Sequence, residues 1–178
     1  MQVFRERGTA ARVPTPRPRS VTAEARRLDA ADLSHGGGRS AWLGVRVLGA
    51  LSLLAVGAVH LQQYYALYSA IPTIGTLFVL NFAGATALGL GLLAPVERLL
   101  GPRGGPVLAL LSLGGIALAA TAFVFLLISE HTPLFGFMEP GYDPAAILAS
   151  RTAEAVAVLS LGGLLAARLA RKAPTGSW

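Results

Sequence analysis

Four long apolar stretches divide the chain, and short stretches of polar and turn-forming residues separate them. Each apolar stretch exceeds the roughly 20 residues that an α-helix needs to cross a hydrocarbon core of about 30 Å. The pattern predicts an all-α fold, a transmembrane four-helix bundle over residues 41–170. The expected spans cover about residues 41–65, 71–93, 106–129 and 144–170.

The first 40 residues differ from the rest of the chain in composition. Eight arginines alternate there with three prolines and with a run of three glycines at residues 36–38. Such a segment buries too little apolar surface to offset its loss of chain entropy on folding. We therefore predict a disordered basic tail over residues 1–40, with room for a short helix over roughly 22–33, and a short C-terminal tail over residues 171–178.

The charges indicate how the bundle is oriented. The chain has 15 lysine and arginine residues against 9 acidic ones, and all the cations except Arg151 fall at one end of the expected bundle. Because positive residues stay on the cytoplasmic side, we expect a multi-pass plasma-membrane protein with both termini in the cytoplasm. The loop over residues 130–143 then lies outside. Tyr64, Tyr65 and Tyr68 follow the first span, as aromatic residues do at a membrane interface.

The composition excludes several classes of function. Hydrophobic residues make up 53% of the chain and charged residues 13%, against about 25% charged residues in soluble domains. The absence of cysteine excludes disulfides, thiolate metal sites and thiol redox chemistry. No nucleophile–base pair, phosphate loop or dinucleotide motif is present. We expect a non-enzymatic accessory protein that contacts the lipid bilayer and other membrane proteins and no nucleic acid.

Each expected span carries one polar side chain at a similar depth. His60 and Glu154 each lie 14 residues from the arginine that marks the basic end of their helix. Asn81 and Thr121 lie 14 and 15 residues from the proline at the corresponding end of theirs. At 1.5 Å per residue, all four lie about 21–23 Å from the basic end. Since a charged group in mid-bilayer costs roughly 2.5–3.5 kcal/mol, we expect this polar layer to face the bundle interior.

Within this layer we expect His60 and Glu154 to meet, with Asn81 close by. The first and fourth helices of an up-down-up-down bundle are neighbours, which permits the contact. Arg151, three residues before Glu154 on the same helix, is the competing partner. Glu130 and His131 should lie above the layer, at the outer mouth of the bundle.

Four interpretations of these residues remain open. In the simplest, the polar layer fixes the packing of the helices and needs no cofactor. In the second, His60 and His131 are axial haem ligands of a redox protein. In the third, these histidines bind a divalent metal ion together with Glu130 and Glu154. In the fourth, His60, Arg151 and Glu154 form a proton relay or a site for a small ligand.

The segments HLQQYYALYSAIPTIGTLFVLNFAGATALGLGLL (His60–Leu93) and EHTPLFGFMEPGYDPAAI (Glu130–Ile147) suggest a relationship. Together they resemble a group of uncharacterised four-span membrane proteins of actinobacteria, and the general plan is similar to that of the DoxX-like small membrane proteins. The resemblance covers roughly residues 45–170. It implies a four-span topology and carries over no catalytic residue.

The charge pattern generates a first prediction. A location reporter fused after residue 172 or inserted near residue 100 should report the cytoplasm, because positive flanks hold these sites inside. A reporter near Glu139 should report the opposite side. An external signal at position 100 would contradict the four-span arrangement.

Overall fold

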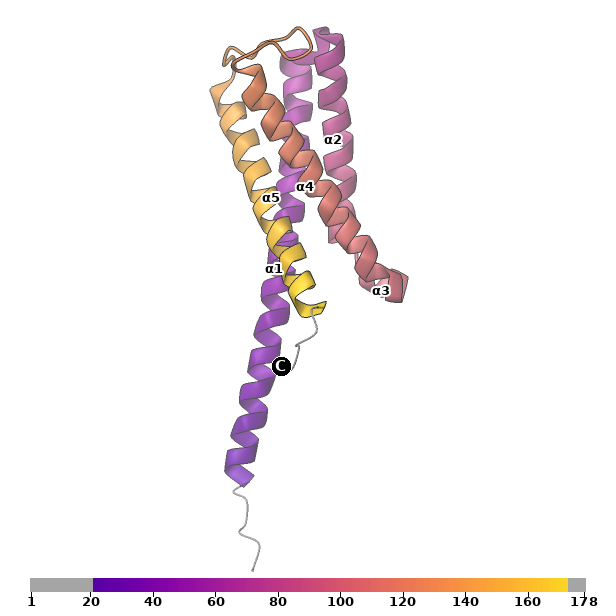
Figure 1. The fold of residues 1–178 in the computed structure, drawn as a ribbon, viewed down its shortest axis with the longest axis vertical. Coiled ribbons are helices and arrows are strands. Elements are labelled where there is room, and N and C mark those ends of the chain that lie inside the picture. The colour runs from indigo at the N-terminus through magenta and orange to yellow at the C-terminus, as the bar shows by residue number, and fades with distance from the viewer. Residues whose placement is uncertain (1–20, 173–178) are drawn as a thin grey trace, which may run out of the picture. The chain divides into compact units, whose positions relative to one another are not determined.

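The computed structural model describes residues 21–172, with side chains described from residue 40 to residue 171. These residues fold into helices connected by short turns and one longer loop (Figure 1). In chain order the elements are α1 (Val21–Ala66), η1 (Tyr68–Ala70), α2 (Pro72–Leu93), α3 (Val96–Leu100), η2 (Gly101–Arg103), α4 (Gly104–Ser129) and α5 (Pro144–Lys172). Within the described part of the chain, β-structure is limited to one isolated bridge between Leu134 and Phe137. The all-α prediction is confirmed.

Within the described part of the chain, four segments are long and apolar enough to cross a membrane, namely Ser40–Ala66, Pro72–Leu93, Val96–Ser129 and Pro144–Arg171. They agree with the expected spans to within a few residues, except that the third also includes the short α3 and η2. All four belong to the compact unit that begins at Arg39. The chain therefore has the architecture of a small multi-pass membrane protein.

The helix α1 begins earlier than the first expected span. It starts at Val21, inside the segment for which the sequence predicts a disordered tail. Residues 21–33 are rich in alanine and also contain leucine and arginine, all of which favour helix. The disorder predicted for residues 1–20 and the tail predicted for residues 173–178 lie outside the described residues.

Glycines let the four long helices approach closely. A Cβ at Gly57 of α1 would lie 3.3 Å from the carbonyl oxygen of Phe82 in α2, and one at Gly49 would lie 2.6 Å from Leu161 of α5. On the other side of the bundle, Gly84 of α2 meets Leu118 of α4. The ring of neighbours is thus α1, α2, α4 and α5, with α1 beside α5 as an up-down-up-down bundle requires. Its core is made of Ala50, Leu53, Leu92, Leu108, Ala119, Ala157, Leu161 and Leu164.

A buried arginine fastens α1 to the end of α2. Arg46 donates from Nε to the carbonyl oxygen of Leu92 at 2.6 Å and from Nη2 to that of Ala94. The Leu92 carbonyl has no partner within α2, because the helix stops before Pro95, whereas the Ala94 carbonyl also accepts from the Val96 N–H at 2.8 Å. We call this end of the bundle, with Arg46, the basic end, and the opposite end, with residues 130–143, the loop end.

A pair of adjacent glycines at the start of α4 provides a test of this packing. A Cβ at Gly104 would lie 2.5 Å from the Cα of Glu97 and 2.8 Å from the carbonyl oxygen of Val96, whereas a Cβ at Gly105 would have nothing within 4 Å. Backbone atoms cannot rotate away, so Gly104→Ala should destabilise the bundle by about 1–3 kcal/mol. Gly105→Ala should leave stability unchanged or slightly raised. Thermal unfolding in detergent measures both, and equal effects would show that α3 does not pack there.

Candidate functional site

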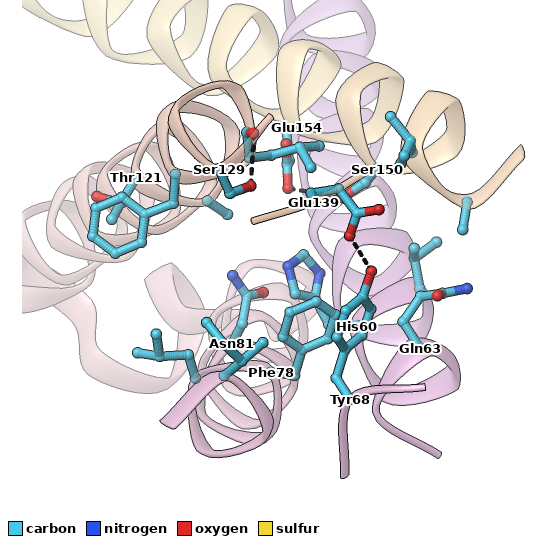
Figure 2. Close-up of a pocket in the computed structure, with 18 of the residues that line it drawn as sticks. His60, Gln63, Tyr68, Phe78, Asn81, Thr121, Ser129, Glu139, Ser150 and Glu154 are labelled. Atoms are coloured by element: carbon cyan, nitrogen blue, oxygen red, sulfur yellow. Dashed lines mark hydrogen bonds between the residues drawn. The ribbon is translucent and has the colours of Figure 1, made fainter. Parts of the chain in front are cut away.

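A cavity of about 470 Å³ lies at the loop end of the bundle (Figure 2). All four long helices contribute to its wall, and η1 and the loop over residues 130–143 complete it. The wall is mostly apolar, with side chains such as Leu77, Phe78, Phe125 and Ile147. Its polar members are His60, Gln63, Tyr68, Asn81, Thr121, Ser129, Glu139, Asp143, Ser150 and Glu154.

The structure brings the four residues of the predicted polar layer around this one cavity. His60, Asn81, Thr121 and Glu154 line it from α1, α2, α4 and α5 respectively. Counting residues from the basic end of each helix therefore identified four residues that line the same cavity. These residues surround a hollow, and within the described part of the chain no hydrogen bond joins any two of them.

The His60 imidazole is oriented by its own helix. Its Nδ1 donates a hydrogen bond to the carbonyl oxygen of Val56 at 2.9 Å, since a carbonyl oxygen can only accept. The ring packs on Phe78 with centroids 5.0 Å apart. Figure 2 shows the ring at the cavity between Asn81 and Tyr68. In the neutral imidazole, Nε2 is then left as a hydrogen-bond acceptor.

The Glu154 carboxyl group is buried at the cavity wall, with the residue only 1% exposed. Its Oε1 accepts a hydrogen bond from the Ser150 hydroxyl at 2.9 Å, and its Oε2 has no partner among the described residues. The predicted hydrogen bond or ion pair with His60 is not formed within the described residues, and the one hydrogen bond of the imidazole runs from Nδ1 to the backbone of Val56. The two side chains line the same cavity without a hydrogen bond between them among the described residues.

Arg151 does not form an ion pair with Glu154 either. The expectation that Arg151 competes with His60 for the Glu154 carboxyl group is therefore wrong. Its guanidinium contacts the Glu130 carboxylate at the end of α4. Helical side chains lean towards the N-terminus of their helix, and the N-terminus of α5 is at the loop end. The Arg151 guanidinium therefore reaches Glu130 and forms its ion pair there.

The cavity is rich in hydrogen-bond acceptors and carries no permanent cation. Among its lining residues are the carboxyl groups of Glu139, Asp143 and Glu154, and neither lysine nor arginine. The Asn81 Oδ1 is buried without a partner among the residues described, like the Glu154 Oε2. Such an interior disfavours anions and offers its free positions to N–H and O–H donors.

A buried carboxylate holds the loop over the cavity. Glu139 accepts hydrogen bonds from the Tyr68 hydroxyl, from the Gly141 N–H at 2.9 Å and from the Tyr142 N–H at 3.1 Å. Burial, and then this bond to Glu139, raises the pKa of Tyr68 well above its ordinary value, so the hydroxyl stays a donor. Tyr68, which the sequence places at the membrane interface, is buried within the protein against Phe78 and Phe137.

A second contact joins the loop to α1. The Gln63 amide donates to Asp143 Oδ2 at 2.8 Å, while Asp143 Oδ1 accepts from the Ala146 N–H at 3.0 Å and so caps the first turn of α5. Two hydrogen bonds lower the pKa of Asp143: the larger effect comes from the Ala146 N–H and the smaller from the Gln63 amide. Asp143 is thus an ionised cap that also fixes the loop.

The structure does not bring the two histidines to one cavity, and the haem interpretation stays a prediction. His131 is exposed, its Nδ1 donates to the carbonyl oxygen of Leu127, and it does not line the cavity with His60. In the described part of the chain, no three histidine, cysteine or acidic side chains converge on a point that could hold a metal ion. The described residues thus offer no cluster of three ligands for the divalent metal ion of the third interpretation.

Sequence reasoning did not single out Tyr68, Glu139, Ser150 or Asp143 as site residues. The four-residue spacing of Ser150 and Glu154 on one helix face was an available signal, as was Asp143 directly before the proline that starts α5. The burial of Glu139 depends on the path of the loop and has no such signal. No known family model matches the chain, and no curated protein or solved structure is significantly similar to it.

The Asp143 cap provides a prediction. Asp143→Ala removes both of its hydrogen bonds and should lower the thermal unfolding midpoint by a few degrees, whereas Asp143→Asn retains a capping oxygen and should lower it less. A carboxylate with a lowered pKa stabilises the fold above its ordinary pKa of 3.8, and the effect is lost as the pH falls through the folded-state value. The advantage of the wild type over Asp143→Asn should therefore shrink between about pH 5 and pH 3. A constant difference over that range would contradict the ionised cap.

Proposed function

We propose that the chain is a membrane protein that binds a small lipophilic molecule in the cavity at the loop end, through hydrogen bonds donated by the ligand. The observation that carries this proposal is the unpartnered Oε2 of Glu154, a residue 1% exposed, at the wall of a cavity of about 470 Å³. A buried polar atom without a partner costs about 1–3 kcal/mol, and a bound donor would remove that cost.

The chemistry of the wall supports the class of ligand. Apolar side chains from four helices favour a hydrocarbon or aromatic body. The free acceptors on Asn81 and Glu154, with His60 Nε2 beside them, favour a ligand that carries an O–H or N–H group. The carboxyl groups of the lining disfavour an anion.

The packing of α2 and α4 supports entry of the ligand from the bilayer. The two helices touch at Gly91 with Leu111 and at Gly84 with Leu118. Beyond Gly84 they diverge towards the loop end, where α4 lies near α5 and away from α2 (Figure 1). Leu80, 61% exposed, and the exposed Thr121 border the cavity in this gap. A lipid-dissolved molecule would reach the acceptors without crossing the loop.

Conduction of protons across the membrane has less support than binding. Between Glu154 and Arg168 of α5, between His60 and Arg46 of α1, and throughout α2 and α4, the sequence contains no ionisable residue. This half of the bundle is filled by a close-packed apolar core. A relay would need polar groups or water through that layer.

Two probes that differ in one donor test the proposal. The wild-type protein in detergent should bind 2-naphthol up to about ten-fold more tightly than 2-methoxynaphthalene, because a hydrogen bond to a buried acceptor contributes about 0.5–1.5 kcal/mol. Calorimetric titration or native mass spectrometry would measure both affinities. The variant Glu154→Leu should bind both probes and lose the preference for the naphthol.

The control is Thr152→Val on the same helix. Thr152 is exposed, does not line the cavity, and its hydroxyl donates to the carbonyl oxygen of Leu148. This variant should keep the wild-type preference. Equal affinity of the wild type for the two probes, or failure of both to bind, would refute the proposed function.

A further inference from the structure

We propose that a groove at the basic end of the bundle is a binding site for an anionic phospholipid. The groove has a volume of about 860 Å³ and lies between the ends of α1, α2, α4 and α5, with α3 at its edge. It is separate from the cavity at the loop end and shares no lining residue with it. The inference does not depend on the proposed function.

The groove carries an excess of positive charge. Four arginines line it, and Glu97 is its single acidic residue. Glu97 already accepts from Arg168 at 2.5 Å and lies 3.6 Å from Arg46. Four arginines and one glutamate give the lining a net formal charge of +3.

Two of the four arginines are committed to the fold. Arg46 caps α2, and Arg168 donates to the carbonyl oxygen of Gly105 at 2.7 Å. Both guanidinium groups also lie over the Trp42 ring, at 5.8 and 5.2 Å from its centroid. They form a rigid, positively charged floor.

The other two arginines are available to a ligand. Arg98 and Arg171 are exposed, and within the described residues no carboxylate pairs with either. Guanidinium groups bind phosphate oxygens through paired N–H donors. We infer that these two side chains hold the lipid phosphate.

The apolar part of the groove suits acyl chains. Leu43 is 52% exposed and Leu169 is 69% exposed, and both line the groove beside Val47 and Leu165. Leu43 and Leu169 lie at the level of the arginines, whereas Val47 and Leu165 follow Arg46 and precede Arg168 on the side towards the middle of the helices, as the hydrocarbon of a phospholipid continues from its headgroup. A free phosphate ion would use the arginines alone, so the combination favours a lipid.

Native mass spectrometry of the full chain in detergent, with defined additions of dioleoyl-phosphatidylglycerol or dioleoyl-phosphatidylcholine, tests the site. The wild type should prefer phosphatidylglycerol. Arg98→Gln and Arg171→Gln should each reduce that preference about five-fold, since a basic residue near an anionic lipid contributes about 1 kcal/mol. Arg103→Gln is the matched control, because Arg103 is exposed at the same end and does not line the groove.

The control variant should keep the wild-type preference, and the thermal unfolding midpoints in phosphatidylcholine should be alike for all four proteins. An equal loss in the three variants would show that overall charge decides the preference, and would overturn the proposal. So would an absence of preference in the wild type. Inorganic phosphate that displaces phosphatidylglycerol at equal concentration would also overturn it, by assigning the arginines to a free anion.

Discussion

The structure depends on one constraint: a polar group inside a hydrocarbon layer has to find its partner within the protein. Most polar groups of the bundle satisfy it locally. Ser112 and Ser160 donate to carbonyl oxygens of their own helices, and Arg46 satisfies the end of α2. Around the cavity the constraint is left unmet at Asn81 and Glu154. Buried polar atoms without a partner at the wall of a cavity are the physical reason to expect a ligand there.

The small residues explain why the hollow lies at the loop end. Near the basic end, glycines such as Gly49, Gly89 and Gly91 receive leucine side chains from the facing helix, and the core is filled. Towards the loop end, α2 and α4 separate, and large side chains such as Phe78 and Phe125 border the gap without closing it. The same four helices therefore form a packed half, which gives stability, and an open half, which gives a site.

The helices and the members of the polar layer were predictable because both follow from positions along single helices. Length and hydropathy located the spans, and counting residues from each basic end placed His60 and Glu154 at one depth. Their contacts were not predictable in this way. The direction in which Arg151 leans and the burial of Glu139 depend on the N-terminal tilt of helical side chains and on the path of a fourteen-residue loop. Local periodicity carries no information about a loop that folds back over the bundle.

The separation of the two ends limits how they can influence each other. Arg46 and His60 share α1, and Glu154 and Arg168 share α5, with 14 residues, or about 21 Å, between the members of each pair. No ionisable side chain lies between them, so charge cannot pass along a chain of hydrogen bonds. The helices themselves are the remaining connection. Because Gly49 of α1 is packed against Leu161 of α5, a lipid that fixes the two helices at the basic end would also fix the spacing of His60 and Glu154 across the cavity.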